Sequence, residues 1–262
     1  MTQIIGISGK KQSGKDTVTN FLHGYIMMQH DVINQFFISK YGELVIDVDK
    51  KNDNGSETIE MGVLDLNQKN EAFINYASNR IWPLIKKYSF ADPLKEMLHV
   101  MFDIPLDNLY GTNEQKDQKI EHLLWENLPY KTGKTGPMSS REFMQQFGTK
   151  IMRKMYKKIW LNNCFKRIDF DEPDKAVIND CRFLDEVEEV KANNGIVIRL
   201  LRDVYQEEDE SETALGNYDN FDIVIDNREI GIVETNNLVL QELINRGILH
   251  SMNMSAKNVT LE

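Results

Sequence analysis

Five short runs of hydrophobic residues are predicted to be strands, and amphipathic helical patterns separate most of them. The runs are Ile4–Ser8, Lys87–Phe90, Ala176–Asn179, Ile196–Leu201 and Asp222–Ile225. Strands that alternate with helices are typical of βαβ units, which build a parallel sheet. We therefore expect an α/β fold in which a five-stranded parallel sheet carries helices on both faces.

A long stretch separates the first predicted helix from the second strand. Residues 41–65 contain two alternating runs, at 44–48 and 58–61, around an Asn-Gly pair at 54–55. This pattern predicts a β-hairpin inserted at the rim of the sheet, either as a functional part or as a decoration. Residues 67–86 are then predicted to form a helix that leads into the second strand.

A further helical segment begins at Ser139. Ser139 and Glu142 are three residues apart, which is the spacing of a capping box. The pattern predicts one helix that ends at Gly148 and a second helix from Thr149 to about Arg167.

The turn after the first strand carries the most specific motif of the chain. Residues 9–17 read Gly-Lys-Lys-Gln-Ser-Gly-Lys-Asp-Thr, which fits the P-loop pattern G-x-x-x-x-G-K. Backbone N–H groups of such a loop surround a phosphate chain, and the lysine reaches the terminal phosphates of a nucleoside triphosphate. A helix predicted from Lys15 to Met28 would point its N-terminus at the anion. The motif predicts binding of ATP or GTP by Gly9, Lys10, Ser13, Gly14, Lys15, Asp16 and Thr17.

Polar side chains also follow the other predicted strands. Asp92 comes after the second strand, Asp180 and Arg182 after the third, and Arg202 after the fourth. Open α/β sheets bind ligands at the carboxyl ends of their strands, so these residues are candidates for the same site.

Charge and composition exclude several classes of protein. The net charge of −10 disfavours a protein that binds nucleic acid by neutralising its phosphates. No apolar run approaches the length of a membrane span, and the chain begins without a charged leader or an apolar signal region. Cys164 and Cys181 have no C-x-x-C spacing and are predicted to be reduced thiols. We therefore expect a cytoplasmic protein without a nucleic-acid or membrane partner.

Residues 138–170 stand out because they carry eight basic and two acidic side chains in an acidic chain. Such an excess predicts either an anion site or a solvated helix face covered by lysines. We favour the solvated face for the lysines. For Arg141 and Arg153 we favour phosphate binding, because a planar guanidinium binds phosphate through two parallel hydrogen bonds.

Six motifs, in this order, resemble the deoxynucleoside monophosphate kinases of tailed bacteriophages. They are the Gly-Lys-Asp-Thr end of the P-loop, Ser89–Lys95, Arg141–Thr149 followed by Trp160, Val177–Glu186, Ser211–Thr213 and Phe221–Asn227. The resemblance covers nearly the whole chain, and residues 41–65 are the main stretch outside it.

The resemblance implies a P-loop nucleoside monophosphate kinase fold with a five-stranded parallel sheet in the order 2-3-1-4-5. It implies a single domain over residues 1–262, with an acceptor-binding helical segment near 92–167 and a lid near 202–220. The implied activity transfers the γ-phosphoryl group of ATP, with Mg²⁺, to a deoxynucleoside 5′-monophosphate. In a phage this reaction supplies deoxynucleotides for DNA synthesis in the host cytoplasm.

The metal site is expected to contain carboxylates. Most P-loops place a Mg²⁺-binding hydroxyl after the lysine, but here that position is Asp16, and Thr17, one residue later, is a further candidate metal ligand. Asp16 either replaces the hydroxyl as a hard oxygen ligand or favours the helix N-terminus by its charge. Asp180 is expected to be the second carboxylate that orients Mg²⁺.

The acceptor phosphate is expected to lie between arginines. Arg182 would bind it from the third strand, while Arg141 and Arg153 would complete the clamp. We expect Lys15, Arg141, Asp180 and Arg182 to be catalytic. Asp92, Gln145 and Trp160 are further candidates for the acceptor site, and Trp160 has the alternative of being a core residue on a helix face.

Arg202 is expected to be the lid arginine that contacts ATP. Residues 203–213 carry six acidic side chains and no basic one. An acidic lid is a poor phosphate clamp, so the chain departs here from the basic lids of many monophosphate kinases.

Two other readings of the motif stay open. Another small-molecule P-loop kinase, such as a dephospho-coenzyme A or phosphomevalonate kinase, could carry the same loop. A P-loop ATPase or switch is a second alternative, although the guanine-binding pattern Asn-Lys-x-Asp is absent from the sequence. The accepted bases and the oligomeric state, monomer or homodimer, are also left open.

Overall fold

The chain folds into two compact units. The computed structural model describes residues 1–51, 57–203 and 214–252. The first unit is formed by residues 1–89 and 168–262, and the second by residues 90–167. The second unit covers almost the same residues as the predicted acceptor-binding segment, whose role stays a prediction, as does the single-domain reading.

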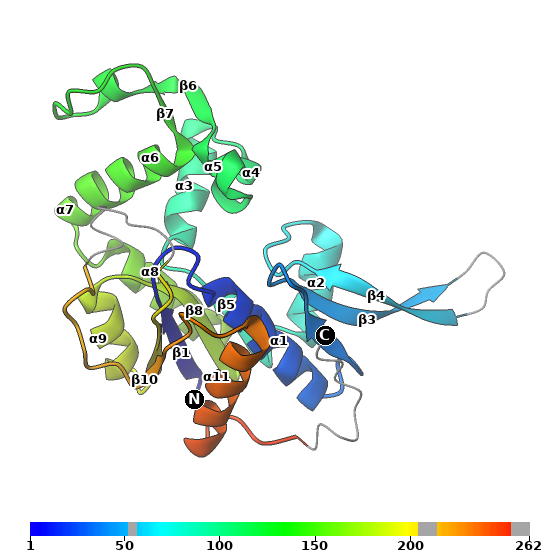
Figure 1. The fold of residues 1–262 in the computed structure, drawn as a ribbon. Coiled ribbons are helices and arrows are strands. Elements are labelled where there is room, and N and C mark those ends of the chain that lie inside the picture. The colour runs from blue at the N-terminus through cyan, green and yellow to red at the C-terminus, as the bar shows by residue number, and fades with distance from the viewer. Residues whose placement is uncertain (52–56, 204–213, 253–262) are drawn as a thin grey trace. The chain divides into compact units, whose positions relative to one another are not determined.

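The first unit is built on a five-stranded parallel sheet (Figure 1). Its strands are β1 (Gln3–Ser8), β5 (Ile85–Tyr88), β8 (Lys175–Cys181), β9 (Ile196–Leu200) and β10 (Ile223–Ile225). They lie in the order β10-β9-β1-β8-β5. Counted among themselves in chain order, these strands read 2-3-1-4-5 from the β5 edge, because the other strands of the chain take the intervening labels. The α/β class is confirmed, and β5 begins two residues earlier than predicted.

Helices cover both faces of this sheet. Helices α1 (Lys15–Gln29) and α11 (Ile232–Asn245) contact each other and share one hydrophobic core with the sheet. Helix α9 (Leu184–Ala192) packs on the opposite face, where Gly6 is its close neighbour. A Cβ atom on Gly6 would lie 2.9 Å from Cys181 Sγ of the neighbouring strand β8, so a side chain there would crowd the Cys181 thiol.

The insertion forms a three-stranded antiparallel sheet of β2 (Phe36–Ile38), β3 (Leu44–Lys51) and β4 (Glu57–Leu64). The two strands of the predicted hairpin are confirmed as β3 and β4. Its Asn-Gly turn lies outside the described residues. The additional strand β2 was not predicted. Short strands such as β2 carry too few residues to show an alternating pattern.

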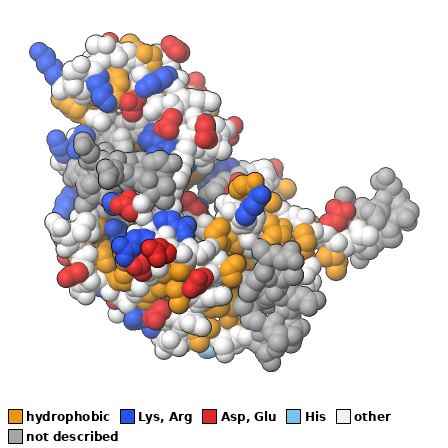
Figure 2. Space-filling view, viewed as in Figure 1, with side chains coloured by type: hydrophobic (Ala, Val, Ile, Leu, Met, Phe, Trp, Pro, Cys, Tyr) orange, Lys and Arg blue, Asp and Glu red, His pale blue; other side chains and the backbone are white. Residues whose placement is uncertain are grey.

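The inner face of the insertion belongs to the main core. Leu44 is fully buried, and it packs with Phe36 into the same cluster as α1. Ile59 and Val63 of β4 are instead 63% and 58% exposed, and Figure 2 shows hydrophobic side chains along the arm of β3 and β4. One face of the insertion therefore packs against α1 as part of the main hydrophobic core.

Helix α2 (Glu71–Arg80) follows the insertion and is shorter than the predicted helix at 67–86. Asn70 caps its N-terminus by accepting a hydrogen bond from the Phe73 N–H at 2.8 Å. Phe73 and Ala77 are its buried residues and join the main core.

The second unit is mainly helical. In chain order it contains α3 (Asp92–Phe102), α4 (Leu106–Tyr110), α5 (Asn113–Asp117), β6 (Lys119–Leu124), a 3₁₀ turn (Trp125–Asn127), β7 (Pro137–Ser139), α6 (Ser140–Met144), a π-helix (Gln145–Met152), α7 (Arg153–Met155) and most of α8 (Ile159–Asp171). Phe102, Phe143 and Phe147 form an aromatic cluster with ring centroids 4.9 to 5.8 Å apart.

The helix that begins at Ser140 does not end at Gly148, as predicted. The capping box of Ser139 and Glu142 is confirmed, but the chain continues as a π-helix and α7 up to Met155. Gly148 acts by its size: a Cβ there would lie 2.5 Å from Leu94 Cδ2. The sequence pattern could not separate a glycine that ends a helix from one that permits close packing.

The predicted second helix from Thr149 is also wrong, because α8 begins only at Ile159. The break falls at Tyr156, whose φ of −145° and ψ of 100° are extended.

No helix in the described parts of the chain is both long and apolar enough to span a bilayer.

Replacement of Gly24 by alanine tests the packing of the insertion on α1. A Cβ at Gly24 would lie 2.4 Å from Phe36 Cδ2. We expect Gly24→Ala to lower the free energy of unfolding by about 1–3 kcal/mol, because overpacking outweighs the helix propensity of alanine. Urea denaturation measures the change.

Gly62→Ala is the matched control, since its Cβ would meet Val48 Cγ2 at an ordinary 3.4 Å. Equal stability of Gly24→Ala and the wild type would show that the insertion does not press on α1.

Candidate functional site

The loop between β1 and α1 has the backbone of a phosphate cradle. Gly14 has a φ of 100°, and Gln12 has a φ of 59°, so both lie in the left-handed region. A Cβ on Gly9 would lie 2.3 Å from Ser13 Oγ, which explains the requirement for glycine there. The loop ends at the N-terminus of α1, where the helix dipole favours an anion.

The buried side chains of Lys15 and Ser13 in this loop could both bind a phosphate oxygen. Lys15 is 8% exposed, and its Nζ donates to the carbonyl oxygens of Gly9 at 2.7 Å and Lys10 at 2.6 Å. Ser13 Oγ is buried, and within the described residues it has no hydrogen-bond partner. A buried hydroxyl without a partner is costly, and a phosphate oxygen would satisfy it. These residues therefore fit the phosphate chain of a nucleotide.

Asn227, which follows β10, supports the phosphate loop by a hydrogen bond to its backbone. It is 1% exposed, its Nδ2 donates to the Ser13 carbonyl at 2.9 Å, and its Oδ1 accepts from the Arg202 N–H at 2.8 Å. Its side chain thereby joins the phosphate loop to the end of β9. Asn227 closes the Phe221–Asn227 motif, but it was not predicted as a site residue, because its contact with the Ser13 carbonyl joins positions 214 residues apart.

The predicted lid arginine lies against the backbone. Arg202 Nε donates to the Asn227 carbonyl at 3.0 Å, and its Nη2 donates to the Ile230 carbonyl at 2.5 Å. Lys10, a predicted phosphate ligand, forms an ion pair with Asp203. The remaining acidic residues of the predicted lid, at 204–213, lie outside the described residues, as do those of the Ser-Glu-Thr motif.

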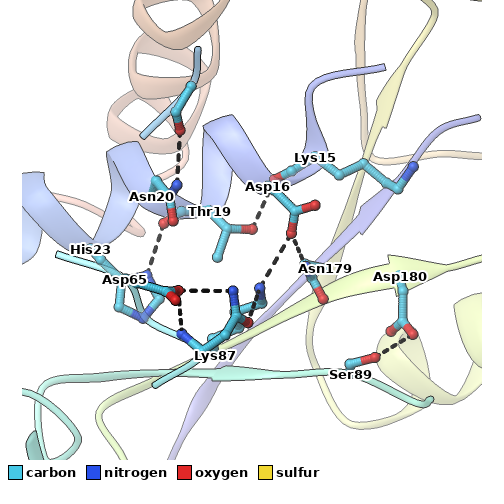
Figure 3. A network of polar contacts seen from close by, with 12 residues as sticks. Lys15, Asp16, Thr19, Asn20, His23, Asp65, Lys87, Ser89, Asn179 and Asp180 are labelled. Atoms are coloured by element: carbon cyan, nitrogen blue, oxygen red, sulfur yellow. Dashed lines mark hydrogen bonds and ion pairs between the residues drawn. The ribbon is translucent and has the colours of Figure 1, made fainter. Parts of the chain in front are cut away.

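Asp16 is held by two donors from neighbouring strands (Figure 3). Asn179 Nδ2 donates to its Oδ1 at 2.6 Å, and Lys87 Nζ lies 3.2 Å from the same oxygen. Asn179 and Lys87 lie on β8 and β5 of the central sheet, so the tertiary fold brings them to the first turn of α1.

Asp180 lies beside this group and accepts a hydrogen bond from Ser89 Oγ at 2.5 Å (Figure 3). Arg182 follows β8 directly, and its backbone N–H donates to Glu186 Oε2 at 2.8 Å. Of the residues predicted at the carboxyl ends of the strands, Asp180 lies beside the Asp16 group (Figure 3), and its role in a site stays a prediction. Lys87, Ser89 and Asn179 were not predicted as site residues, although all three lie within the predicted strands Lys87–Phe90 and Ala176–Asn179.

Thr17 faces the insertion. A Cβ on Gly42, in the turn between β2 and β3, would lie 2.3 Å from Thr17 Oγ1, and Asn20 Nδ2 donates to the Gly42 carbonyl at 2.8 Å. This contact argues against Thr17 as a metal ligand. Of the two residues after Lys15, Asp16 is the better candidate.

The donor set fits Mg²⁺ bound mainly through a nucleotide. In the described part of the chain, no three His, Cys, Asp or Glu side chains form a group that could hold a metal by themselves. Mg²⁺ in phosphotransferases keeps several waters and takes one or two carboxylates together with substrate phosphates. Asp16 and Asp180 supply carboxylates of this kind.

The remaining predicted residues belong to the second unit. Arg141 Nε donates to Asp117 Oδ1, and its Nη2 donates to Asn113 Oδ1, both at 2.7 Å. Trp160 is 5% exposed and donates from Nε1 to the Gly148 carbonyl at 3.2 Å, which favours its alternative role as a core residue.

Three more predicted residues occupy helix positions of this unit. Gln145 opens the π-helix, Arg153 opens α7, and Asp92 opens α3, where its Oδ1 lies 3.8 Å from Lys95 Nζ. The predicted site residues thus form two groups, one in each unit.

His23 is a buried histidine behind the Asp16 group. Its Nδ1 donates to the Thr19 carbonyl at 2.8 Å, and burial, together with the nearby positive charge of Lys87, lowers its pKa to about 4. The folded state therefore disfavours the protonated form, while the unfolded state takes up a proton below about pH 6.5.

Stability should consequently fall as the pH drops from about 6.5 towards 4, by on the order of 3 kcal/mol from this residue. Urea denaturation at pH 7 and pH 5 measures the loss, and His23→Asn should show a smaller one. The same substitution at the exposed His30 serves as the control. An unaltered pH dependence in His23→Asn would contradict the assignment.

Comparison with known proteins agrees with this geometry. The sequence profile of the family described as "Deoxynucleotide monophosphate kinase" matches residues 3–235. A protein of Acanthamoeba polyphaga mimivirus named "Putative deoxynucleotide monophosphate kinase" is 26% identical over 155 residues, which cover 54% of this chain and 74% of the viral one. The family match at residues 3–235 includes the phosphate loop, the carboxylates Asp16 and Asp180, and the arginines of the second unit. It indicates a nucleotide kinase. The chain belongs to the deoxynucleotide monophosphate kinase family.

Proposed function

We propose that this protein transfers the γ-phosphoryl group of ATP to a deoxynucleoside 5′-monophosphate. The observation that carries the proposal is the interior of the phosphate loop, where the Lys15 ammonium is buried beside a Ser13 hydroxyl that has no hydrogen-bond partner among the described residues. Family membership supports a nucleotide as the acceptor.

Lys15 is the residue that would follow the phosphoryl group. Its ammonium is held by two neutral carbonyl oxygens of the loop. Phosphate oxygens are stronger acceptors because they are charged, so a bound triphosphate would draw the ammonium to itself. Phosphoryl transfer needs mainly such positioning and charge neutralisation.

Mg²⁺ would be held by Asp16 and Asp180, and when bound it neutralises charge on the transferred phosphate. The chain itself orients these carboxylates. Asn179 and Lys87 hold Asp16, and Ser89 donates to Asp180.

Arg141 is suited to bind the acceptor phosphate. Asp117 and Asn113 hold its guanidinium through Nε and Nη2, which reduces the entropy lost on binding. In the proposal, Arg153 and Arg182 complete the clamp. A phosphate monoester is largely ionised near neutral pH, so the reaction needs no strong general base.

Three residues complete the proposed acceptor site. Asp92 and Gln145 would orient the acceptor, while Trp160 contributes through the packing of the π-helix. The resemblance to phage kinases extends the proposal to deoxynucleotide supply for phage DNA synthesis in the host cytoplasm.

Lys15→Met tests the donor half. Loss of the ammonium should lower kcat by about 100-fold or more, because the negative charge of the transition state loses a buried positive charge that stabilises it. Lys166→Met, which removes an exposed lysine of α8, should leave kcat unchanged. Coupled measurement of ADP release, with a saturating acceptor, gives both values. Full activity of Lys15→Met would contradict the role of the loop.

Acceptor specificity is tested with all deoxy- and ribonucleoside monophosphates in parallel. We expect ATP consumption with at least one deoxynucleotide and little without an acceptor, because a kinase excludes water from the reacting phosphate. Arg141→Met should raise the KM for the acceptor by about 10–100-fold, the value of charged hydrogen bonds. Lys154→Met, which removes an exposed lysine of α7 in the same unit, is the control.

Rapid acceptor-free hydrolysis would instead support an ATPase or switch. Activity on dephospho-coenzyme A or phosphomevalonate alone would support another small-molecule kinase.

A further inference from the structure

Lys87 places a positive charge directly against the carboxylate of the phosphate loop. Its Nζ lies 3.2 Å from Asp16 Oδ1 and donates to Asn67 Oδ1 at 2.9 Å (Figure 3). The Lys87 side chain is 16% exposed, whereas that of Asp16 is 75% exposed. The ammonium therefore approaches Asp16 from the protein side and leaves the carboxylate accessible from solvent.

The position of this ammonium is fixed by the end of the insertion. Asn67, just after β4, donates from its backbone N–H and its Nδ2 to Asp65 Oδ1 at 2.8 and 3.1 Å. These bonds orient the Asn67 amide so that its oxygen faces Lys87. Asp65, Asn67 and Lys87 thus form a chain of hydrogen bonds that leads from the insertion to Asp16.

The neighbouring lysine on the same strand shows that this placement is specific. Lys86 points to the other face of β5, where its Nζ contacts Asp171 Oδ2 at 2.7 Å and lies 4.2 Å from the centre of the Trp82 ring. Two adjacent lysines with similar burial therefore neutralise different carboxylates, and Lys87 is the one aligned with Asp16.

We propose that Lys87 is the counter-ion of Asp16, which keeps divalent cations from binding at this carboxylate without a nucleotide. This inference rests on the proposed function and names the control of its metal site. A divalent cation at Asp16 would lie close to the Lys87 ammonium and be repelled by it. A triphosphate brings several negative charges that outweigh this repulsion, so metal and nucleotide enter together.

The insertion gains a role from this arrangement. Asp65 at its end, together with Asn67 two residues later, holds the counter-ion in place. Lys87 is accordingly a positioning residue, since it acts on the metal through Asp16.

Binding of Mn²⁺ to the full-length, nucleotide-free protein tests the proposal by electron paramagnetic resonance. Wild type should bind Mn²⁺ weakly. Lys87→Met should bind it about tenfold more tightly or better, the effect of removing one adjacent like charge. Lys87→Arg keeps the charge and should resemble wild type. Lys86→Met removes the neighbouring charge and is the matched control, with no expected change.

Two further variants show whether the effect runs through Asp16 and the insertion. Asp16→Asn combined with Lys87→Met should abolish the gain in Mn²⁺ affinity. Asn67→Ala should give a smaller gain than Lys87→Met, because the ammonium loses its support but keeps its charge. Thermal unfolding confirms that each variant is folded, and Lys87→Arg and Asn67→Ala carry the test if Lys87→Met is not.

Unchanged or weaker Mn²⁺ binding by folded Lys87→Met would overturn the counter-ion role. Kinase assays of the wild type separate this result from the proposed function. A wild type that phosphorylates no deoxynucleotide, with the Mn²⁺ pattern intact, would reject the activity and keep the counter-ion. A wild type that phosphorylates a deoxynucleotide, with variants that lack the expected changes in Mn²⁺ affinity, would keep the activity and reject the counter-ion.

Discussion

The backbone conformation of the loop between β1 and α1 is the constraint on which the rest of the site depends. Gly14 takes a left-handed φ, and Gly9 has no space for a side chain beside Ser13. That geometry turns the Lys15 ammonium inward onto the loop carbonyls. Asn227 holds the Ser13 carbonyl from a strand more than 200 residues away in the sequence. The conformation of this local motif is therefore also held by a residue from a distant part of the chain.

The insertion changes how this cradle should be understood. Its inner face packs on α1 through Phe36 and Leu44, its β2–β3 turn lies against Thr17, and Asn67, just after β4, contacts Lys87. A peripheral hairpin would have few such links, whereas this one supports the first turns of the phosphate-binding helix. Asn67 thereby orients the lysine that lies against Asp16, because Asn67, Lys87 and Asp16 share one hydrogen-bond network.

The second unit shows where pattern reasoning fails. The capping box at Ser139 was predictable because it depends on two residues three positions apart. The fate of the helix at Gly148 was not, since it depends on Leu94 in another helix. Trp160 and Arg141 likewise acquire their partners, the Gly148 carbonyl and Asp117, only through tertiary packing. Their roles in acceptor binding remain proposals that the assays above address.

The sequence by itself determined the parallel α/β sheet, the phosphate loop and the family, because alternating hydrophobic runs and a contiguous glycine-lysine motif are local properties. It also located Asp180 and Asn179 at a strand end. Only the tertiary structure decided that Asp16 is paired with Lys87 and Asn179, that Thr17 faces Gly42, and that Asn227 supports the loop. Such pairings join residues distant in sequence, and their energies depend on burial and distance, which no linear pattern contains.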